Sequence, residues 1–381
     1  MDKKYDYIII GGGLVGSLVS LVLSKHSKSV CLIEKYKYNN LTTDSYSPLS
    51  LTFNSVEFLK EKNLWDEKYL KSRNIDKLKI KLFNSFNTID LDCKELNIDY
   101  LGSVVEKASF LSYLRDLCNQ NENISIVDEV DAKLNDVDSP TKIIFSKSSK
   151  TLEFNKLIIT DGSDSRFAKH LKIDSTHIDY NQTSYIFNAQ YDSSSMTAYQ
   201  IFSTKGVFAI LPGSGKNRSI VATLHNKYID DFKFESNDMN ISLLERELQP
   251  HLKNLTNLKL VYNHPLNTTR LNSWTMNNII FLGNSSQLLH PFGAQGFNFA
   301  LNCIKTIDSH ISKLFINGEV NQDVKNLIQK KREILFKSID LTSLALMKND
   351  IISNISSLVF SKSLNSSRTL KRKFLRRILS I

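Results

Sequence analysis

The chain has 381 residues, of which 41% are hydrophobic, so it can bury the cores of two or three domains and is not a disordered protein. Its 49 basic and 39 acidic residues give a net charge of +10, and six of the basic residues lie, without any acid, in residues 368–381. No apolar run is long enough to span a membrane, and the spacing of the four cysteines excludes a zinc ribbon or a disulfide scaffold and suits a reducing cytoplasm.

The first 34 residues predict a strand, a glycine turn, a helix and a second strand. Residues 5–10 (YDYIII) form an apolar run typical of a buried parallel strand, and residues 14–25 have helical periodicity. Between them lies the G-x-G-x-x-G sequence of residues 11–16, and the second strand ends at Glu34. Glycines let the backbone approach a pyrophosphate, the helix N-terminus offers N–H groups, and an acid at this distance accepts hydrogen bonds from a ribose. This pattern predicts a dinucleotide-binding unit.

The middle of the chain changes from alternating helices and strands to strands alone. Helices are expected at residues 54–65 and 106–120, and a buried strand at residues 157–160 runs into Asp161-Gly162. The strand-rich block covers residues 178–270, with strands expected at 183–191, 196–202, 207–211, 219–224 and 258–262. A β-rich block after an α/β block indicates a second domain inserted into the first.

A second strand-to-helix junction follows the β-rich block. The strand at residues 279–282 leads into GNSSQLLHPFGAQGFN at residues 283–298, and a helix begins near Gly296. Small residues at such a junction let backbone amides reach a ligand. Because this junction is so far from the first glycine turn, the pair predicts one long cofactor held by two distant segments. A further helical region is expected at residues 323–360.

Four segments in this order resemble the flavin-dependent aromatic hydroxylases, the group of 4-hydroxybenzoate hydroxylase and the ubiquinone-biosynthesis hydroxylases. The segments are residues 11–16, 101–106, 161–165 and 283–298. Within the group, Asn284 and Gln287 match the 2-octaprenyl-6-methoxyphenol hydroxylases, where other relatives have Asp and His. The resemblance implies an α/β fold, in which an FAD-binding Rossmann-like three-layer domain carries an inserted β-rich substrate domain.

The resemblance also implies a set of cofactor-binding residues. The glycines of the first turn would bind the FAD pyrophosphate, Glu34 the ribose, and Asn284 the ribityl region in place of an aspartate. The amides of residues 296–298 would face the isoalloxazine ring. The full set is Gly11, Gly13, Leu14, Val15, Gly16, Glu34, Lys35, Glu106, Val130, Asp161, Gly283, Asn284, Pro291, Gly296, Phe297 and Asn298. No catalytic acid or base and no metal ligand is assigned, and His290 is expected to pack or to contact the flavin.

The expected domain organisation follows from these segments. The FAD-binding domain takes residues 1–75, 101–177 and 271–320, and the substrate domain takes residues 76–100 and 178–270, before a C-terminal helical region at 321–365 and a basic amphipathic tail at 366–381. If the tail is helical, its apolar residues lie on one face and its basic residues on the rest, a pattern typical of binding to an anionic lipid surface.

The implied activity is an FAD-dependent monooxygenase that hydroxylates the aromatic ring of a polyprenylated phenol in ubiquinone biosynthesis. It would use O₂ as co-substrate, NAD(P)H or another electron donor, and a C4a-hydroperoxyflavin. The expected partners are the phenol, and a membrane surface reached through the tail or other ubiquinone-biosynthesis proteins, but no nucleic acid. The expected location is cytoplasmic, peripheral on the inner face of the membrane. The alternatives are a sister monooxygenase acting on another ring position or on a soluble phenol, a prenyl-chain reductase of the same fold, and a non-catalytic flavin-binding assembly subunit.

Overall fold

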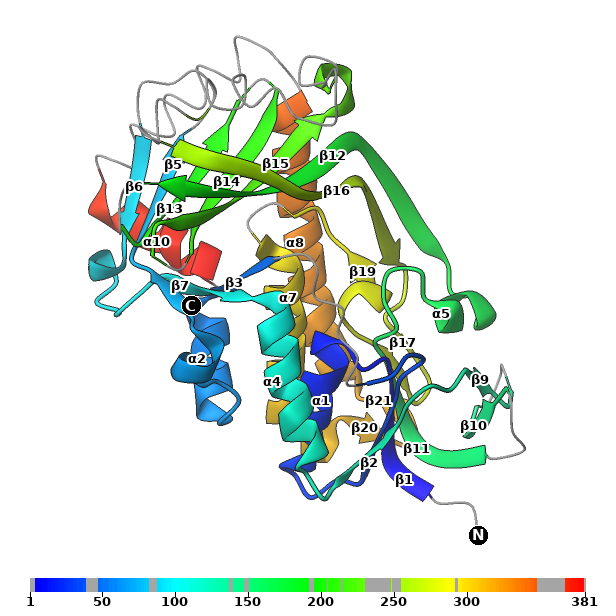
Figure 1. Ribbon diagram of the computed structural model, residues 1–381. Helices are drawn as coiled ribbons and strands as arrows, with labels where there is room; N and C mark the ends of the chain where they lie inside the picture. Colours follow the sequence, from blue (N-terminus) through cyan, green and yellow to red (C-terminus); the bar gives the residue numbers. More distant parts are fainter. Residues whose placement is uncertain are drawn as a thin grey trace. The chain divides into compact units, whose positions relative to one another are not determined.

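The structure is a computed structural model that divides into two compact units (Figure 1). It describes residues 4–38, 47–81, 88–136, 140–146, 151–191, 195–203, 205–213, 215–229, 248, 255–291, 294–347 and 367–379. Unit 1 comprises Met1–Thr43, Ala108–Ile178 and Asn267–Ser338, and unit 2 comprises Asp44–Lys107, Asp179–Leu266 and Ile339–Ile381. Residues 44–75, which the sequence placed with the FAD-binding domain, are grouped here with unit 2. The expected domain boundaries stay a prediction.

Unit 1 is built around a mainly parallel sheet. Its strand order is β17 (Thr275–Met276), β18 (Ile279–Phe281), β11 (Thr151–Ile159), β1 (Lys4–Ile10), β2 (Val30–Ile33) and β8 (Ile124–Val127). The strands from β18 to β8 are parallel, while β17 is antiparallel. Two short strands, β9 (Ala132–Leu134) and β10 (Lys142–Phe145), extend the sheet beside β11. The apolar runs of the sequence are buried here as expected.

Helices cover this sheet. Helix α1 (Leu14–Ser24) packs against β1, β2, β8 and α7 (Gln295–Ser309), and ten of its eleven residues are buried. The other elements of unit 1 are α4 (Lys107–Asn119), α5 (Arg166–His170), η4 (Gly283–Ser285), β19 (Gln287–Leu288), η6 (Ile311–Lys313), β20 (Phe315–Ile316) and β21 (Glu319–Val320). Helix α8 (Gln322–Met347) begins in unit 1, and its residues from Ile339 onward are grouped with unit 2. Helix α8 follows the expected helical region as far as residue 347, and residues 348–366 lie outside the described residues. Within the described part of the chain, no helix has the length and apolar character needed to cross a bilayer.

Unit 2 contains most of a second, largely antiparallel sheet. Its strand order is β19, β16 (Leu255–Leu271), β12 (Ser175–Tyr191), β15 (Asn217–His225), β14 (Gly206–Pro212), β13 (Thr197–Phe202), β5 (Lys77–Lys81) and β6 (Thr88–Asp92). Strand β5 pairs with β13 in parallel, so a segment far away in the sequence joins this sheet. Alternate residues face opposite sides: Tyr185 and Phe187 enter the apolar core, whereas Ser184 lies on the other face, opposite Thr223.

The rest of unit 2 includes a small sheet and the basic tail. The small sheet contains β3 (Pro48–Thr52), β7 (Gly102–Glu106) and β4 (Arg73–Ile75), and the helices are α2 (Phe53–Glu61), α3 (Glu67–Leu70), η1 (Cys93–Glu95), η2 (Asn226–Tyr228) and α10 (Arg368–Leu379). Helix α10 is held on η1, because Lys371 Nζ lies 3.3 Å from Glu95 Oε1 and Arg372 Nε donates to the Glu95 carbonyl at 2.7 Å. Residues 368–379 of the tail are helical, which is the condition for the expected amphipathic pattern, and two of its basic side chains bind Glu95.

Two strands are much longer than expected. Strands β12 and β16 contain 17 residues each, whereas the sequence indicated nine and five. Both include exposed polar residues at positions that alternate irregularly, so the period-2 signal is lost over half of their length.

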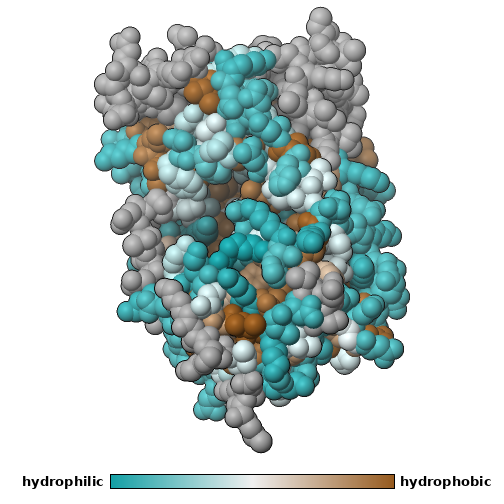
Figure 2. All heavy atoms as spheres, turned by 90° about the vertical axis from the view of Figure 1, so that its right-hand side faces the viewer, coloured by the Kyte–Doolittle hydropathy of each residue, from teal (hydrophilic) through white to brown (hydrophobic). Residues whose placement is uncertain are grey.

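On the face drawn in Figure 2, hydrophilic residues cover most of the described surface and hydrophobic ones form small separate groups.

Candidate functional site

The predicted cofactor segments converge because they follow parallel strands. In the register of the unit 1 sheet, Ile10 is paired with both Ile33 and Ile159, and Ile159 is also paired with Phe281. The carboxyl ends of β2, β1, β11 and β18 therefore lie in one row. Ligands of open parallel sheets bind at this edge. The first glycine turn, Glu34, Asp161 and Gly283 all follow these strand ends within one or two residues.

The first glycine turn combines tight packing with one open position. A Cβ added at Gly16 would lie 1.8 Å from the Gly11 carbonyl oxygen, so this glycine lets the helix approach the turn. At Gly13 an added Cβ would meet no atom within 4 Å, which leaves open space beside the backbone. The first hydrogen bond of helix α1 runs from the Ser17 N–H to the Gly13 carbonyl at 2.9 Å. The N–H groups of the residues just before Ser17 are therefore not used by hydrogen bonds within the helix. This geometry fits a diphosphate.

Glu34 lies against this turn. Its Oε2 accepts the Gly12 N–H at 2.6 Å and its Oε1 accepts the Tyr36 N–H at 3.1 Å, which leaves further lone pairs on both oxygens. The Val130 N–H donates to the Glu34 carbonyl at 3.4 Å, so the two predicted residues are neighbours. Lys35 follows Glu34, and its ammonium lies 5.6 Å from the centre of the Tyr36 ring. A carboxylate in this position can accept hydrogen bonds from a ribose.

Asp161 offers a buried oxygen for a ligand. The hydroxyl of the preceding Thr160 lies 2.8 and 2.9 Å from the carbonyl oxygens of Ile10 and Gly11, which ties β11 to the glycine turn. Asp161 Oδ2 accepts the Arg166 N–H at 3.1 Å, whereas Oδ1 is buried without a hydrogen-bond partner in the described structure. Burial raises the pKa of this carboxyl. An unpaired buried oxygen at the ligand edge is the expected signature of a missing hydrogen-bond donor.

The second junction contacts the first. Gly283 has φ of +65°, and an added Cβ would lie 2.9 Å from Val15 Cγ2, in the first turn of α1. Ser285 Oγ lies 2.7 Å from the Ile159 carbonyl oxygen and so fixes η4 to the end of β11. Asn284 lies between these two anchors and its side chain is exposed. The two distant glycine segments therefore lie against each other in the fold.

The start of α7 completes this part of the site. Ala294 takes the left-handed conformation, with φ of +52°, and its carbonyl accepts a hydrogen bond from Asn298 Nδ2 at 2.7 Å. A Cβ at Gly296 would meet no atom within 4 Å, and Gln295 Oε1 is buried without a partner in the described structure. Phe297 is held edge-to-face with Phe110. An open glycine and an unpaired amide oxygen at a helix N-terminus fit a bound group.

His290 and Pro291 precede this helix start. His290 is 2% exposed, and burial lowers its pKa to about 4, so the ring is neutral at physiological pH. Pro291 accepts the Ala294 N–H through its carbonyl at 3.1 Å. Residues 292–293 lie outside the described residues. A neutral, enclosed imidazole is suited to packing, and the role of His290 stays a prediction.

One predicted residue lies in the other unit. Glu106 is the last residue of β7 in unit 2, where it is paired with Pro48 in the small sheet. Fifteen of the sixteen predicted cofactor residues thus belong to unit 1, and their roles, like that of Glu106, stay predictions.

Two buried arginines support the site but were not recognised from the sequence. Arg115 of α4 donates to the carbonyl of Gly12 through Nε and Nη2, at 3.2 and 3.1 Å. Arg332 of α8 donates to Gln287 Oε1 at 2.8 Å and to the Leu271 carbonyl at 2.9 Å. Burial lowers the pKa of Arg332 to about 10, which leaves it charged. The sequence offered one signal for Arg115: its position in α4 falls among the apolar residues of the helix's buried face, where an arginine is unusual.

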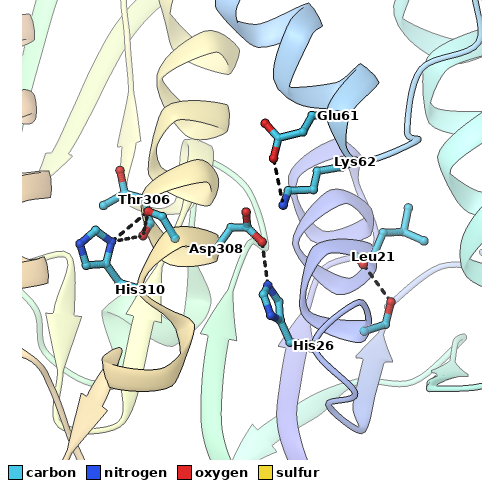
Figure 3. A network of polar contacts seen from close by, with 9 residues as sticks. Leu21, His26, Glu61, Lys62, Thr306, Asp308 and His310 are labelled. Carbon is cyan, nitrogen blue, oxygen red and sulfur yellow. Dashed lines mark hydrogen bonds and ion pairs between the residues drawn. The ribbon is translucent and has the colours of Figure 1, made fainter.

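The two helices of the site are also joined at their far ends (Figure 3). His26, just after α1, lies with Nε2 2.7 Å from Oδ1 of Asp308, near the end of α7. The N-termini of the same helices carry the two glycine segments. This contact therefore fixes the spacing of the helices at the end opposite the site.

Comparison with known proteins identifies the class. The family described as "FAD binding domain" matches residues 4–321. Because the match covers most of the chain, the protein belongs to this family of FAD-binding proteins. The predicted fold class and cofactor are thereby confirmed, and the open glycines and unpaired buried oxygens described above fit that cofactor.

Several individual proteins are similar to this chain along most of its length. Ubiquinone biosynthesis monooxygenase COQ6, mitochondrial, of Dictyostelium discoideum is 24% identical over 403 residues, which cover 87% of this chain and 80% of the relative. Ubiquinone hydroxylase UbiL of Rhodospirillum rubrum is 21% identical over 312 residues, which cover 80% of this chain and 72% of the relative. Among solved structures, p-nitrophenol 4-monooxygenase PnpA from Pseudomonas putida has a TM-score of 0.77 at 13% identity, with 100% of this chain and 99% of that chain covered. At 13% identity, the structural similarity to PnpA shows that the two proteins share a fold and nothing more.

Unit 2 offers a polar sheet face as well as its apolar core. Ser184 Oγ and Ser219 Oγ are buried and have no hydrogen-bond partner in the described structure. Both lie on the face opposite the core residues Tyr185 and Ala222, because side chains alternate along β12 and β15. A sheet face with unpaired hydroxyls can bind a polar ligand group.

Proposed function

We propose that this protein is an FAD-dependent monooxygenase that hydroxylates the ring of a polyprenylated phenol in ubiquinone biosynthesis. The observation that carries the proposal is the contact of the two glycine segments, where Gly283 packs on Val15 beside the open backbone of Gly13. Relatives that match more than three quarters of the chain are named as a ubiquinone biosynthesis monooxygenase and as a ubiquinone hydroxylase, which supports the choice of pathway.

Bound FAD, once reduced, would supply the activation of O₂. The protein's own residues have simpler tasks. Backbone N–H groups near Gly13 would bind the diphosphate, Glu34 would accept hydrogen bonds from the ribose, and Asn284 would bond the ribityl region. Asp161 would direct its unpaired Oδ1 to a donor of the cofactor. The burial of His290, which is 2% exposed, would help to keep water from the reacting ring.

The substrate is proposed to be an electron-rich phenol with a long prenyl chain. The unpaired, buried hydroxyl of Ser184 in unit 2 is a candidate to bond one oxygen substituent of the substrate. The electron donor is proposed to be NAD(P)H or a partner protein that takes its place.

Access to such a substrate requires contact with a bilayer, and the tail is proposed to provide it. In helix α10, Arg372, Lys373 and Arg376 are exposed, and Leu370 is 46% exposed. Basic residues near an anionic surface contribute about 1 kcal/mol each. The protein would thus act as a peripheral protein of the membrane's inner face, alone or bound to other proteins of the pathway.

The experiment is a product analysis with purified, FAD-loaded protein, an electron donor and a prenylated phenol. A gain of one oxygen supports a monooxygenase, and the position of the new hydroxyl identifies the ring carbon. A gain of two hydrogens would instead identify a prenyl-chain reductase. Consumption of O₂ that does not respond to any phenol, with no product, would favour a flavin-binding assembly subunit. A quinone extract from a deletion strain tests the pathway, since the accumulated intermediate identifies the blocked step.

A further inference from the structure

The guanidinium of Arg115 is buried directly behind the first glycine turn. The residue is 8% exposed, and both Nε and Nη2 donate to the Gly12 carbonyl, at 3.2 and 3.1 Å. Nη1 donates to the Tyr38 carbonyl, and the guanidinium carbon lies 4.4 Å from the centre of the Tyr38 ring. Within the described structure, the hydrogen bonds of this buried cation thus go to backbone carbonyl oxygens and not to a carboxylate.

Burying the charge of Arg115 in this way costs free energy unless a negatively charged group interacts with it. Burying a cation without an anionic partner carries a desolvation penalty that bonds to neutral carbonyls only partly offset. Where a buried arginine only fills space, an apolar residue of similar volume often stabilises the protein as well or better. A diphosphate bound on the other side of the turn would supply the missing negative charge.

The hydrogen bonds of Arg115 also fix the direction of one peptide group. In a trans peptide the C=O and N–H point in opposite directions, so a Gly12 carbonyl directed at Arg115 turns the Gly13 N–H away from it. The neighbouring Gly12 N–H is already used by Glu34 Oε2, at 2.6 Å. The Gly13 N–H therefore points away from Arg115, and the same residue has open space on its Cα, where an added Cβ would meet no atom within 4 Å.

We propose that Arg115 is a positioning residue for the cofactor's diphosphate, acting through the Gly12–Gly13 peptide. It holds that peptide so that the Gly13 N–H is directed at the ligand, and its charge balances the diphosphate across the turn. The inference rests on the proposed FAD site and assigns one electrostatic determinant of it to a residue outside the glycine turn.

The test compares ligands that differ only in the diphosphate. Full-length protein freed of flavin is titrated with ADP and with adenosine by calorimetry, for wild type, Arg115→Lys and Arg115→Gln. The glutamine can still donate to the Gly12 carbonyl but has no charge, whereas the lysine keeps the charge. Arg218→Met is the matched control, because Arg218 is also buried and also donates to carbonyl oxygens, those of Asn217 and Ser195 in unit 2, at 2.7 and 3.1 Å. Urea unfolding of each variant measures stability separately.

Loss of a charge-assisted contribution should weaken ADP binding by about tenfold or more in Arg115→Gln and leave adenosine within about twofold. Arg115→Lys should recover most of the ADP affinity, and the ADP affinity of Arg218→Met should match wild type. Added salt should reduce the difference between wild type and Arg115→Gln.

Equal loss of ADP and adenosine affinity in Arg115→Gln would indicate a purely structural role and overturn the inference, as would unchanged affinity for both. If wild type binds FAD but Arg115→Gln binds ADP as wild type does, only the inference fails. If wild type binds neither FAD nor ADP, the proposed function fails with it. The side chains of Arg115→Lys and Arg115→Gln can each still donate to the Gly12 carbonyl and fill most of the space. The comparison of ADP and adenosine affinities is therefore not made on a variant with a large cavity.

Discussion

Alanine substitution at two glycines of the first turn should separate cofactor binding from folding. Gly13 has φ of −74° and ψ of −172°, an ordinary extended conformation that alanine adopts without strain, and its added Cβ would contact no protein atom. Gly16 has no such space, because its Cβ would lie 1.8 Å from the Gly11 carbonyl oxygen. Gly13→Ala should therefore fold normally and lose FAD, whereas Gly16→Ala should lose stability.

The expected magnitudes follow from these contacts. Gly13→Ala restricts the unfolded chain and should raise the free energy of unfolding by about 0.4–1 kcal/mol. Its methyl group keeps the diphosphate from the backbone, and losing a hydrogen bond to a charged group costs about 1.5–3 kcal/mol, or about 10- to 150-fold in the Kd for FAD. In Gly16→Ala the backbone must move by about 1.5 Å to restore a normal contact, and such overpacking costs about 1–3 kcal/mol or more of stability.

Urea unfolding of the flavin-free proteins and fluorescence titration with FAD measure the two quantities independently. The Gly13→Ala protein should have an unfolding midpoint at or above that of wild type together with a raised Kd. A Kd within twofold of wild type would show that the diphosphate does not approach Gly13. A lowered midpoint would show that the space beside Gly13 is needed by the protein and not by the ligand.

The remaining predictions concern the second junction, the tail and a buried histidine. Asn284→Asp should keep FAD bound with a modestly changed Kd, whereas Asn284→Leu should raise the Kd because it offers no acceptor; fluorescence titration of both variants is the measurement. Removing residues 366–381 should leave FAD binding intact and weaken co-sedimentation with anionic vesicles. Glu95→Ala, which releases Lys371, should strengthen this co-sedimentation. Equal sedimentation of wild type and both variants would argue against a lipid-binding tail. Burial lowers the pKa of His290 from 6.5 to about 4, so between these values the unfolded chain binds a proton that the folded chain does not, and stability should fall as the pH drops from about 6.5 toward 4. The variant His290→Asn should show a smaller decrease in urea midpoint between pH 7 and pH 5, and an unchanged decrease would contradict the assignment.

The sequence predicted the parallel sheet and its ligand edge because the signals there are local. Apolar runs identify β1, β2 and β11, and the glycines after Ile10 and Leu282 mark turns that only a few residue types can adopt. The contact of Gly283 with Val15 could be anticipated only as a consequence of binding one ligand. The pair of strand-to-helix junctions suggested such a ligand, and the resemblance to a family identified it as FAD.

The unpredicted parts depend on long-range packing. The parallel pairing of β5 with β13 joins residues about 120 apart in the chain, and no local pattern encodes a partner at that distance. Arg115 and Arg332 are each the one arginine of their helix, and nothing in the helix sequence shows that the side chain is buried. Their burial depends on carbonyl groups from other segments, such as those of Gly12 and Leu271, that fold against them.

The four cysteines of this chain are all buried, and this has a consequence for an enzyme that handles oxygen. Burial raises the pKa of Cys118 and of Cys303 to about 12, and it raises the pKa of Cys93 as well. Since the thiolate is the nucleophile that attacks hydrogen peroxide, these thiols are protected in the folded protein. Hydrogen peroxide released by unproductive turnover should therefore spare the cysteines of intact molecules and oxidise those of unfolded ones, so that thiol oxidation in a sample records how much of the protein has lost its fold.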